Sequence, residues 1–181
     1  GQLGVAERVV AELGLTDPGY LGERASLIDP ANRMAKADAG APPQKGAFDY
    51  APGQSPERPS TTHISVIDAQ GNAASMTSSI EGAFGSHLMV GGFLLNNQLT
   101  DFSYAAVADG RTVANRVEGG KRPRSSMAPI IVFDKNDNVI AVTGSPGGMA
   151  IVPLVSKTLV AMLDWNLTPQ EATNLPNVLI F

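Results

Sequence analysis

The chain has 181 residues, 43% apolar and 17% charged, which is enough for one compact domain or for two pieces of a larger fold. This composition excludes a disordered chain, and a net charge of −4 argues against a nucleic-acid-binding or anionic-membrane surface. Without cysteine, disulfides and thiol catalysis are excluded, and no apolar stretch approaches the roughly 20 residues of a membrane-spanning helix.

The first 37 residues show helical patterns. Apolar residues at helical spacing predict a helix over residues 3–13, and Asp17-Pro18-Gly19 predicts a turn. A second, short helix is expected from Asp29-Pro30 to about Ala37, with proline in its first turn. Because the chain starts without Met and ends inside an apolar run, we expect an internal fragment of a longer protein.

Residues 38–60 differ in composition from the rest of the chain. Five of the 13 prolines lie here, mixed with Gly, Gln and Ser. Such a segment buries too little surface to offset the entropy lost on ordering. We therefore predict an exposed, mobile linker, which is also what backbone cleavage requires.

Period-two alternation begins at Thr62 and predicts a pair of strands around the turn at residues 68–72. In a simple hairpin about this turn, Ser78–Ile80 lies opposite Thr61 and Thr62, which places hydroxyl groups beside Thr61.

The remaining chain alternates strands, loops and helices. We expect a short buried strand at Phe93-Leu94-Leu95, a surface loop over 103–124, strands at 129–133 and 139–143, a helix over about 149–163 and a short capped helix from Thr168. The helix over 149–163 is apolar on most sides, so we expect it to be covered on both faces.

Thr61 is the candidate nucleophile, provided that the Ser60–Thr61 bond is cleaved. An N-terminal threonine can attack an acyl carbon with its own α-amine as the base, since that amine titrates near 8 without tuning. Inside an intact chain, Thr61 has no such base. The alternative is a Thr-Thr pair that merely enters a strand, which threonine favours.

Other polar clusters suit an acyl substrate. Gly144-Ser145-Pro146-Gly147-Gly148 lies between a strand and a helix, where free N–H groups suit an oxyanion or only a tight turn. The hydroxyls of Ser125 and Ser126 suit a carboxylate, whereas Gln98 and Asp101 suit an ammonium or cap their own turn. His63 and His87 lack metal-ligand spacing, and we expect no metal.

Four strings in this order resemble the gamma-glutamyltransferase (gamma-glutamyl transpeptidase) family of N-terminal nucleophile hydrolases. They are TTHISVID at 61–68, LLNNQLTDFS at 94–103, KRPRSSMAP at 121–129 and TGSPGG at 143–148. Upstream, ERASLIDP at 23–30 resembles the end of the family's large subunit. The resemblance covers nearly the whole chain except the linker.

This resemblance implies an α+β fold, a four-layered αββα sandwich, from a proenzyme that cleaves itself into large and small subunits that form a heterodimer. It implies a large-subunit part over 1–37, a linker over 38–60 that ends at the cleavage site, and a small catalytic subunit from 61 through 181. Thr61 matches the nucleophile, and Ser79 matches a position that often holds a second threonine. Gln98 and Asp101 match positions that hold the substrate's α-amino group. Ser125 and Ser126 match positions that hold its α-carboxylate. Gly147 and Gly148 match the oxyanion hole.

The resemblance further implies gamma-glutamyl transfer or hydrolysis on glutathione-like substrates, with water or an amino acid as acceptor and no cofactor. It suggests a periplasmic or extracellular location. One departure is Glu81, which stands where familiar members carry asparagine beside the substrate amine. As a substrate-binding residue, Glu81 can still pair with that ammonium. It also favours a rival, a cephalosporin or glutaryl acylase-like amidohydrolase on the same scaffold. A second rival is a homologue that never matures, and the family's carboxylate-binding arginine lies outside this chain.

Overall fold

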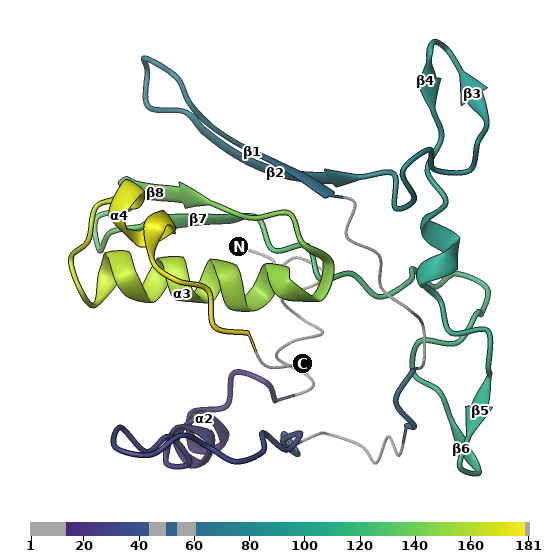
Figure 1. Cartoon of the computed structure of the whole chain (residues 1–181), viewed down its shortest axis with the longest axis horizontal. Coiled ribbons are helices and arrows are strands. Elements are labelled where there is room, and N and C mark those ends of the chain that lie inside the picture. The colour runs from purple at the N-terminus through teal and green to yellow at the C-terminus, as the bar shows by residue number, and fades with distance from the viewer. Residues whose placement is uncertain (1–13, 44–49, 54–60, 180–181) are drawn as a thin grey trace. The chain divides into compact units, whose positions relative to one another are not determined.

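The computed structural model describes residues 14–43, 50–53 and 61–179 (Figure 1). The chain divides into two compact units, Gly1–Tyr50 and Ala51–Phe181. The predicted helix over 3–13 lies outside the described residues, as do two parts of the predicted linker, 44–49 and 54–60. The predicted boundaries at residues 37 and 60 therefore stay a prediction.

The described part of the first unit contains the helix α2, Pro18–Ala25. A turn was expected at its start, but Asp17 is an N-cap whose Oδ1 accepts a hydrogen bond of 2.8 Å from the Tyr20 N–H. Pro18 occupies the first helical position, where its missing N–H costs nothing. The prediction of a turn is thus wrong, and the same residues begin a helix.

The helix predicted from Asp29 to Ala37 is absent. The Asp29 carboxylate accepts 2.8 Å hydrogen bonds from the Ala31 N–H and from the Asn32 side-chain amide. These bonds fold the chain into a local turn, an alternative that Asp offers its own backbone in place of a helix. They also hold the pKa of Asp29 below its usual value, with the Asn32 side chain as the largest cause.

The described part of the second unit holds four two-stranded antiparallel sheets, two 3₁₀ turns and two helices, so its content is mixed α and β. The strands pair as β1 (Thr61–Ile67) with β2 (Ala73–Ser79), β3 (Met89–Val90) with β4 (Phe93–Leu94), β5 (Val107–Ala108) with β6 (Arg111–Thr112), and β7 (Ile130–Phe133) with β8 (Val139–Thr143). The helical segments are η1 (Gln98–Asp101), η2 (Gly148–Ala150), α3 (Ile151–Leu163) and α4 (Pro169–Asn174).

The hairpin β1–β2 has the predicted register. Thr61 pairs with Ser79 and Thr62 with Ser78, and pairing continues without a bulge to Ile67 and Ala73. The polar face of this hairpin approaches β8, where the Ser75 hydroxyl donates a 3.0 Å hydrogen bond to the Thr143 carbonyl. The two long hairpins, β1–β2 and β7–β8, are therefore hydrogen-bonded to each other close to the turn that follows β8.

Helices α3 and α4 are present where helices were predicted, and α3 runs alongside β7–β8 (Figure 1). Thr168 and Glu171 form the expected capping box of α4. Helix α3 buries Ile151, Val155 and Ala161, but Val152 on another face is 51% exposed. The structure thus covers one side of α3, not both as expected. Within the described residues, no helix is long and apolar enough to cross a membrane.

Two expectations for the middle of the chain are wrong. Phe93 was expected in a buried strand, but in β4 it is 64% exposed, because β3–β4 is a short ribbon with only two residue pairs. The expected surface loop over 103–124 contains the ribbon β5–β6 and a buried residue, Val113. Val113 pairs with Ala51, which is itself 2% exposed although it lies within the predicted linker.

The two long hairpins close with the same five-residue loop, Asp-x-x-x-Asn. In each, the aspartate Oδ1 accepts from the N–H groups two and four residues ahead, and Oδ2 accepts from the asparagine amide. The pKa of Asp68 lies below its usual value, mainly because of the hydrogen bond from the Asn72 side chain. The pKa of Asp134 is lowered in the same way, mainly by the Asn138 side chain. In each loop, one aspartate carboxylate thus stabilises the loop conformation and sets the residue at which strand pairing begins.

At about pH 7, we expect Asp134→Asn to lower the melting temperature by a few degrees. The substitution removes the negative charge that the backbone N–H groups and the Asn138 amide stabilise. The folded pKa lies below the unfolded value of about 3.9, so this stabilisation is present above that value and is lost as the pH falls through the folded pKa. The difference in melting temperature from wild type should therefore shrink towards about pH 3.

Asp137→Asn is the matched control, since it makes the same charge change in the same loop and Asn tolerates the positive φ of 63° there. Thermal unfolding followed by circular dichroism over this pH range measures both variants. Equal effects of the two substitutions at neutral pH would contradict the assignment.

Candidate active site

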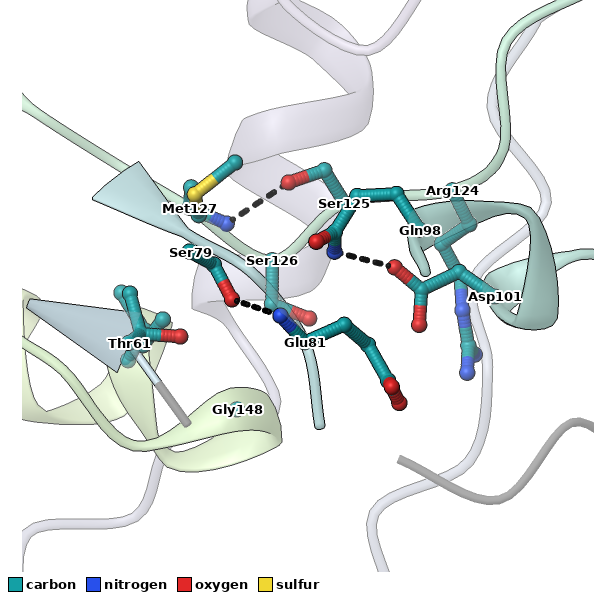
Figure 2. A pocket seen from close by; sticks show the side chains of 11 residues that line it. Thr61, Ser79, Glu81, Gln98, Asp101, Arg124, Ser125, Ser126, Met127 and Gly148 are labelled. Atoms are coloured by element: carbon teal, nitrogen blue, oxygen red, sulfur yellow. Dashed lines mark hydrogen bonds between the residues drawn. The ribbon is translucent and has the colours of Figure 1, made fainter. Parts of the chain in front are cut away.

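A small pocket of the second unit brings together the predicted site residues (Figure 2). All of them except Gly147 line it, and three further residues contribute. The lining residues are Thr61, Ser79, Glu81, Gln98, Asp101, Arg124, Ser125, Ser126, Met127, Gly148 and Ile151. They come from five segments that are far apart in sequence, so only the tertiary structure assembles them. Their predicted roles stay predictions.

Thr61 enters the pocket as the first residue of β1. Its partner across the hairpin is Ser79, the last residue of β2, so the two hydroxyl-bearing residues meet at the open end of the same ladder. In the view of Figure 2, this pair lies at the opposite side of the pocket from Gln98 and Asp101. A substrate bound between these ends would meet a hydroxyl at one and a carboxylate at the other.

Glu81 is a charged residue buried in the pocket wall. It is 4% exposed, its φ of 69° is positive, and its N–H donates a 2.9 Å hydrogen bond to the Ser79 Oγ. Its carboxylate atom Oε2 is buried and has no hydrogen-bond partner among the residues that the structure describes. A buried carboxylate without a partner is destabilising, so this oxygen indicates that a donor or a cation belongs beside it.

The 3₁₀ turn η1 supplies a second set of acceptors. The Gln98 side-chain Nε2 donates a 2.9 Å hydrogen bond to Asp101 Oδ2, which leaves Gln98 Oε1 directed away from that bond. Gln98 Oε1 is also buried, and within the described part of the chain it has no hydrogen-bond partner. Together with Glu81, these oxygens form one acceptor-rich wall that suits an ammonium group better than an anion.

The segment Arg124–Met127 forms a third wall. The Met127 N–H donates a 3.2 Å hydrogen bond to the Ser125 Oγ, which folds the serine pair into a compact turn. Arg124 and Met127 were not predicted as site residues, although they flank Ser125 and Ser126 in one string. Ile151 carried no local signal, because it reads as an ordinary apolar helix residue.

The glycine turn after β8 lies below Thr61 in Figure 2. Gly147 has a φ of 131° and Gly148 a φ of 56°, conformations that favour glycine, and the Ala150 N–H closes the turn on the Gly147 carbonyl at 3.0 Å. The 3₁₀ turn η2 and then helix α3 follow, and the Ile151 N–H donates to the Gly148 carbonyl. Gly148 and Ile151 both line the pocket. Gly147 itself does not line the pocket.

His63 holds neighbouring elements of the site together. Its ring nitrogens lie 2.9 Å from the Thr77 Oγ1 and 3.0 Å from the Ser65 Oγ, and its imidazole packs against Gly144. The ring thereby connects β1 to the start of the glycine turn. Among the described residues, no group of three or more His, Asp or Glu side chains is placed to hold a metal ion.

The pocket has a volume of about 50 Å³, well below the roughly 300–1,000 Å³ of typical small-molecule sites. Its walls are nevertheless chemically distinct, with hydroxyls, acceptors and N–H groups on separate elements. The described residues therefore make part of a binding site, and a substrate would extend beyond them.

Comparisons of sequence and of structure both find similar known proteins. The sequence model of a family described as Gamma-glutamyltranspeptidase matches residues 6–180. The chain is 38% identical over 172 residues to the glutathione hydrolase proenzyme of Bacillus subtilis strain 168, covering 91% of this chain and 28% of that protein. It is 43% identical over 126 residues to the glutathione hydrolase proenzyme of Escherichia coli K12, covering 64% of this chain and 21% of that protein.

Two solved structures are also similar. The T380A mutant of Helicobacter pylori gamma-glutamyltranspeptidase superimposes with a TM-score of 0.52 at 40% identity, over 61% of this chain and 63% of that one. A gamma-glutamyltranspeptidase from Pseudomonas nitroreducens complexed with L-DON gives a TM-score of 0.52 at 39% identity, over 61% of each chain. The chain thus spans about 28% of the length of the Bacillus relative and under two thirds of these structures.

The contact between His63 and Gly144 yields a direct test of how the glycine turn is held. A Cβ on Gly144 would overlap the imidazole ring, so Gly144→Ala should destabilise the protein by about 1–3 kcal/mol. In a His63→Ala background the same substitution should have a much smaller effect, because the obstructing ring is gone.

Denaturant unfolding of the four proteins gives the coupling free energy of this double-mutant cycle. Gly119→Ala is the control, since a Cβ there meets nothing within 4 Å. Additive effects of the two substitutions would contradict the proposed contact.

Proposed function

Because this chain belongs to the gamma-glutamyltranspeptidase family, we propose that it is the part of a proenzyme that carries the nucleophile, Thr61. The parent protein transfers or hydrolyses gamma-glutamyl groups of glutathione and related compounds, and autocleavage at Ser60–Thr61 frees the Thr61 amine. The observation that carries this proposal is the single pocket in which Thr61 faces an acceptor-rich wall and a glycine turn.

The chemistry follows from these positions. The Thr61 hydroxyl attacks the gamma-carbonyl carbon while the Thr61 α-amine, directly or through water, takes the hydroxyl proton. N–H groups of Gly147 and Gly148 stabilise the oxyanion of the tetrahedral intermediate. Its collapse breaks the amide bond, the leaving amine receives the proton, and an ester on Thr61 remains. Water or an acceptor amine then attacks this ester, releases the gamma-glutamyl product and returns the proton to Thr61.

Ser79 supports the nucleophile in this proposal. It faces Thr61 across the ladder, and its Oγ already accepts the Glu81 N–H. The hydroxyl is thereby oriented at the end of β2, where it can stabilise the Thr61 side chain by a hydrogen bond.

Recognition of the glutamyl end rests on charge. The α-ammonium lies against Glu81, Gln98 and Asp101, and supplies the partner that the buried Glu81 Oε2 and Gln98 Oε1 lack. The hydroxyls of Ser125 and Ser126 bind the α-carboxylate, and Arg124 on the same wall adds positive charge to that side. A further carboxylate-binding arginine belongs to the part of the proenzyme outside this chain.

The fold proposal is a four-layered αββα sandwich completed by the rest of a large and small subunit heterodimer. The outer face of β1–β2 supports it, because Ile64, Val66 and Met76 are each about half exposed there, at 46%, 51% and 53%. An apolar sheet face of this kind is normally covered by another layer.

The Glu81 carboxylate also distinguishes a gamma-glutamyl donor from a glutaryl compound, the substrate of the rival acylase. A glutaryl group has no α-amine, so it would leave the Glu81 and Asp101 carboxylates without a cation, at a cost in binding free energy. We therefore favour a gamma-glutamyl donor over the glutaryl compound of an acylase-like enzyme, and an enzyme over a homologue that never matures.

The nucleophile is tested by Thr61→Ala in the proenzyme. We expect no cleavage product by mass spectrometry and a loss of gamma-glutamyl anilide hydrolysis of about 10⁴-fold or more, because both steps need the Thr61 hydroxyl. Thr62→Ala is the matched control, since Thr62 is exposed on the other face of β1. A wild-type protein that stays uncut after long incubation, or an active Thr61→Ala variant, would refute the proposal.

The substrate is tested by comparing a gamma-glutamyl anilide with a glutaryl anilide, in wild type and in Glu81→Gln. Loss of one charged partner should raise KM for the gamma-glutamyl compound about tenfold or more, with a smaller change in kcat. The glutaryl compound should be a poor substrate of the wild type. Turnover of the glutaryl compound alone would make the acylase the correct assignment.

A further inference from the structure

Two asparagine side chains outside the pocket connect the three segments that carry its polar groups. These segments are residues 79–82 at the end of β2, the turn η1, and residues 124–127. Neither Asn97 nor Asn115 lines the pocket, and both are half-buried. Each asparagine connects two of these three segments.

Asn97 joins the first two segments. Its Oδ1 accepts a 2.8 Å hydrogen bond from the Gly82 N–H, and its own N–H donates a 3.2 Å hydrogen bond to the Ile80 carbonyl. These two bonds flank Glu81, whose positive φ of 69° would otherwise be unfavourable for a residue with a side chain. Asn97 directly precedes Gln98, so it holds Glu81 and η1 at a fixed spacing.

Asn115 joins the last two segments. Its Nδ2 donates a 2.7 Å hydrogen bond to the Asp101 carbonyl, and its Oδ1 accepts a 2.9 Å hydrogen bond from the Arg124 N–H. Its own carbonyl accepts a 2.8 Å bond from the Ser103 N–H, which fixes the backbone of Asn115 against the residues after η1. Asn115 therefore sets how far Asp101 lies from Ser125.

We propose that Asn97 and Asn115 are positioning residues that set the distance between the ammonium-binding and carboxylate-binding walls of the pocket. This inference rests on the proposed function, since it assumes an α-amino acid end that both walls hold together. The span between an ammonium and a carboxylate on one carbon is fixed, so a wall displaced by about 1 Å loses one of the two contacts.

The two amides differ in the atoms that they use, and this difference makes the inference testable. Asn97 bridges mainly through Oδ1, because its Nδ2 reaches only the Thr100 Oγ1 at 3.4 Å. Asn115 needs both a donor and an acceptor. Aspartate preserves the acceptor but places a carboxylate oxygen against the Asp101 carbonyl at position 115, where two acceptors repel.

The first experiment is amide hydrogen exchange on the matured protein, and it does not depend on activity. We expect exchange at the Gly82 N–H to be about tenfold or more faster in Asn97→Ala and nearly unchanged in Asn97→Asp. Exchange at the Arg124 N–H should be faster in Asn115→Ala. Unchanged protection in both alanine variants would overturn the inference.

The second experiment is steady-state hydrolysis of a gamma-glutamyl anilide by the same proteins. Asn97→Ala, Asn115→Ala and Asn115→Asp should raise KM about tenfold or more with kcat within about threefold, because Thr61 and the glycine turn are untouched. Asn97→Asp should remain within about threefold of wild type in KM.

The control is Asn177→Asp, which makes the same charge change where Asn177 Oδ1 accepts from the Lys157 ammonium, and it should leave KM unchanged. Equal KM for Asn115→Asp and wild type, or equal losses in Asn97→Ala and Asn97→Asp, would overturn the inference. If the wild type hydrolyses no gamma-glutamyl anilide, the proposed function fails, and so does the role in substrate positioning. The exchange data then still decide whether the asparagines hold the walls.

Discussion

The register of the hairpin β1–β2 is the constraint on which the pocket depends. Side chains alternate between the two faces of a strand, so a slip of one residue would turn Thr61 away from the pocket and break its pairing with Ser79. The Asp68 loop at the other end sets this register, with the Asn72 amide and backbone N–H groups converging on one carboxylate. A surface loop thus determines where Thr61, the proposed nucleophile, lies.

The two faces of this hairpin have opposite chemistry. The inner face carries His63, Ser75 and Thr77, and it approaches the strand β8 and the glycine turn through a hydrogen bond and through the imidazole. The outer face carries the apolar residues Ile64 and Val66, which are half exposed. Polar contacts inside the unit therefore position this hairpin against β8 and the glycine turn, while the apolar face stays half exposed.

The acceptor-rich wall is in an unfavourable arrangement while the site is empty. A buried carboxylate oxygen of Glu81 and a buried amide oxygen of Gln98 lack partners, and Glu81 holds an unfavourable backbone conformation. In the proposed function, the substrate ammonium satisfies both oxygens at once, so part of its binding free energy would come from relief of this arrangement. Asparagine amides behind the wall maintain it while the site is empty.

Local sequence determined the two long hairpins, the register of β1–β2, the capped helix α4 and the family, because these depend on periodicity, turn residues and short motifs. It did not predict the short ribbon β5–β6. It failed at Asp29, whose side chain forms a turn in place of a helix, and at Asp17, which caps a helix in place of a turn. Only the tertiary structure brought Glu81, Gln98 and Ser125 to one pocket with Thr61. The reason is that their spacing depends on hydrogen bonds between segments, which Asn97 and Asn115 make across the fold and no local pattern records.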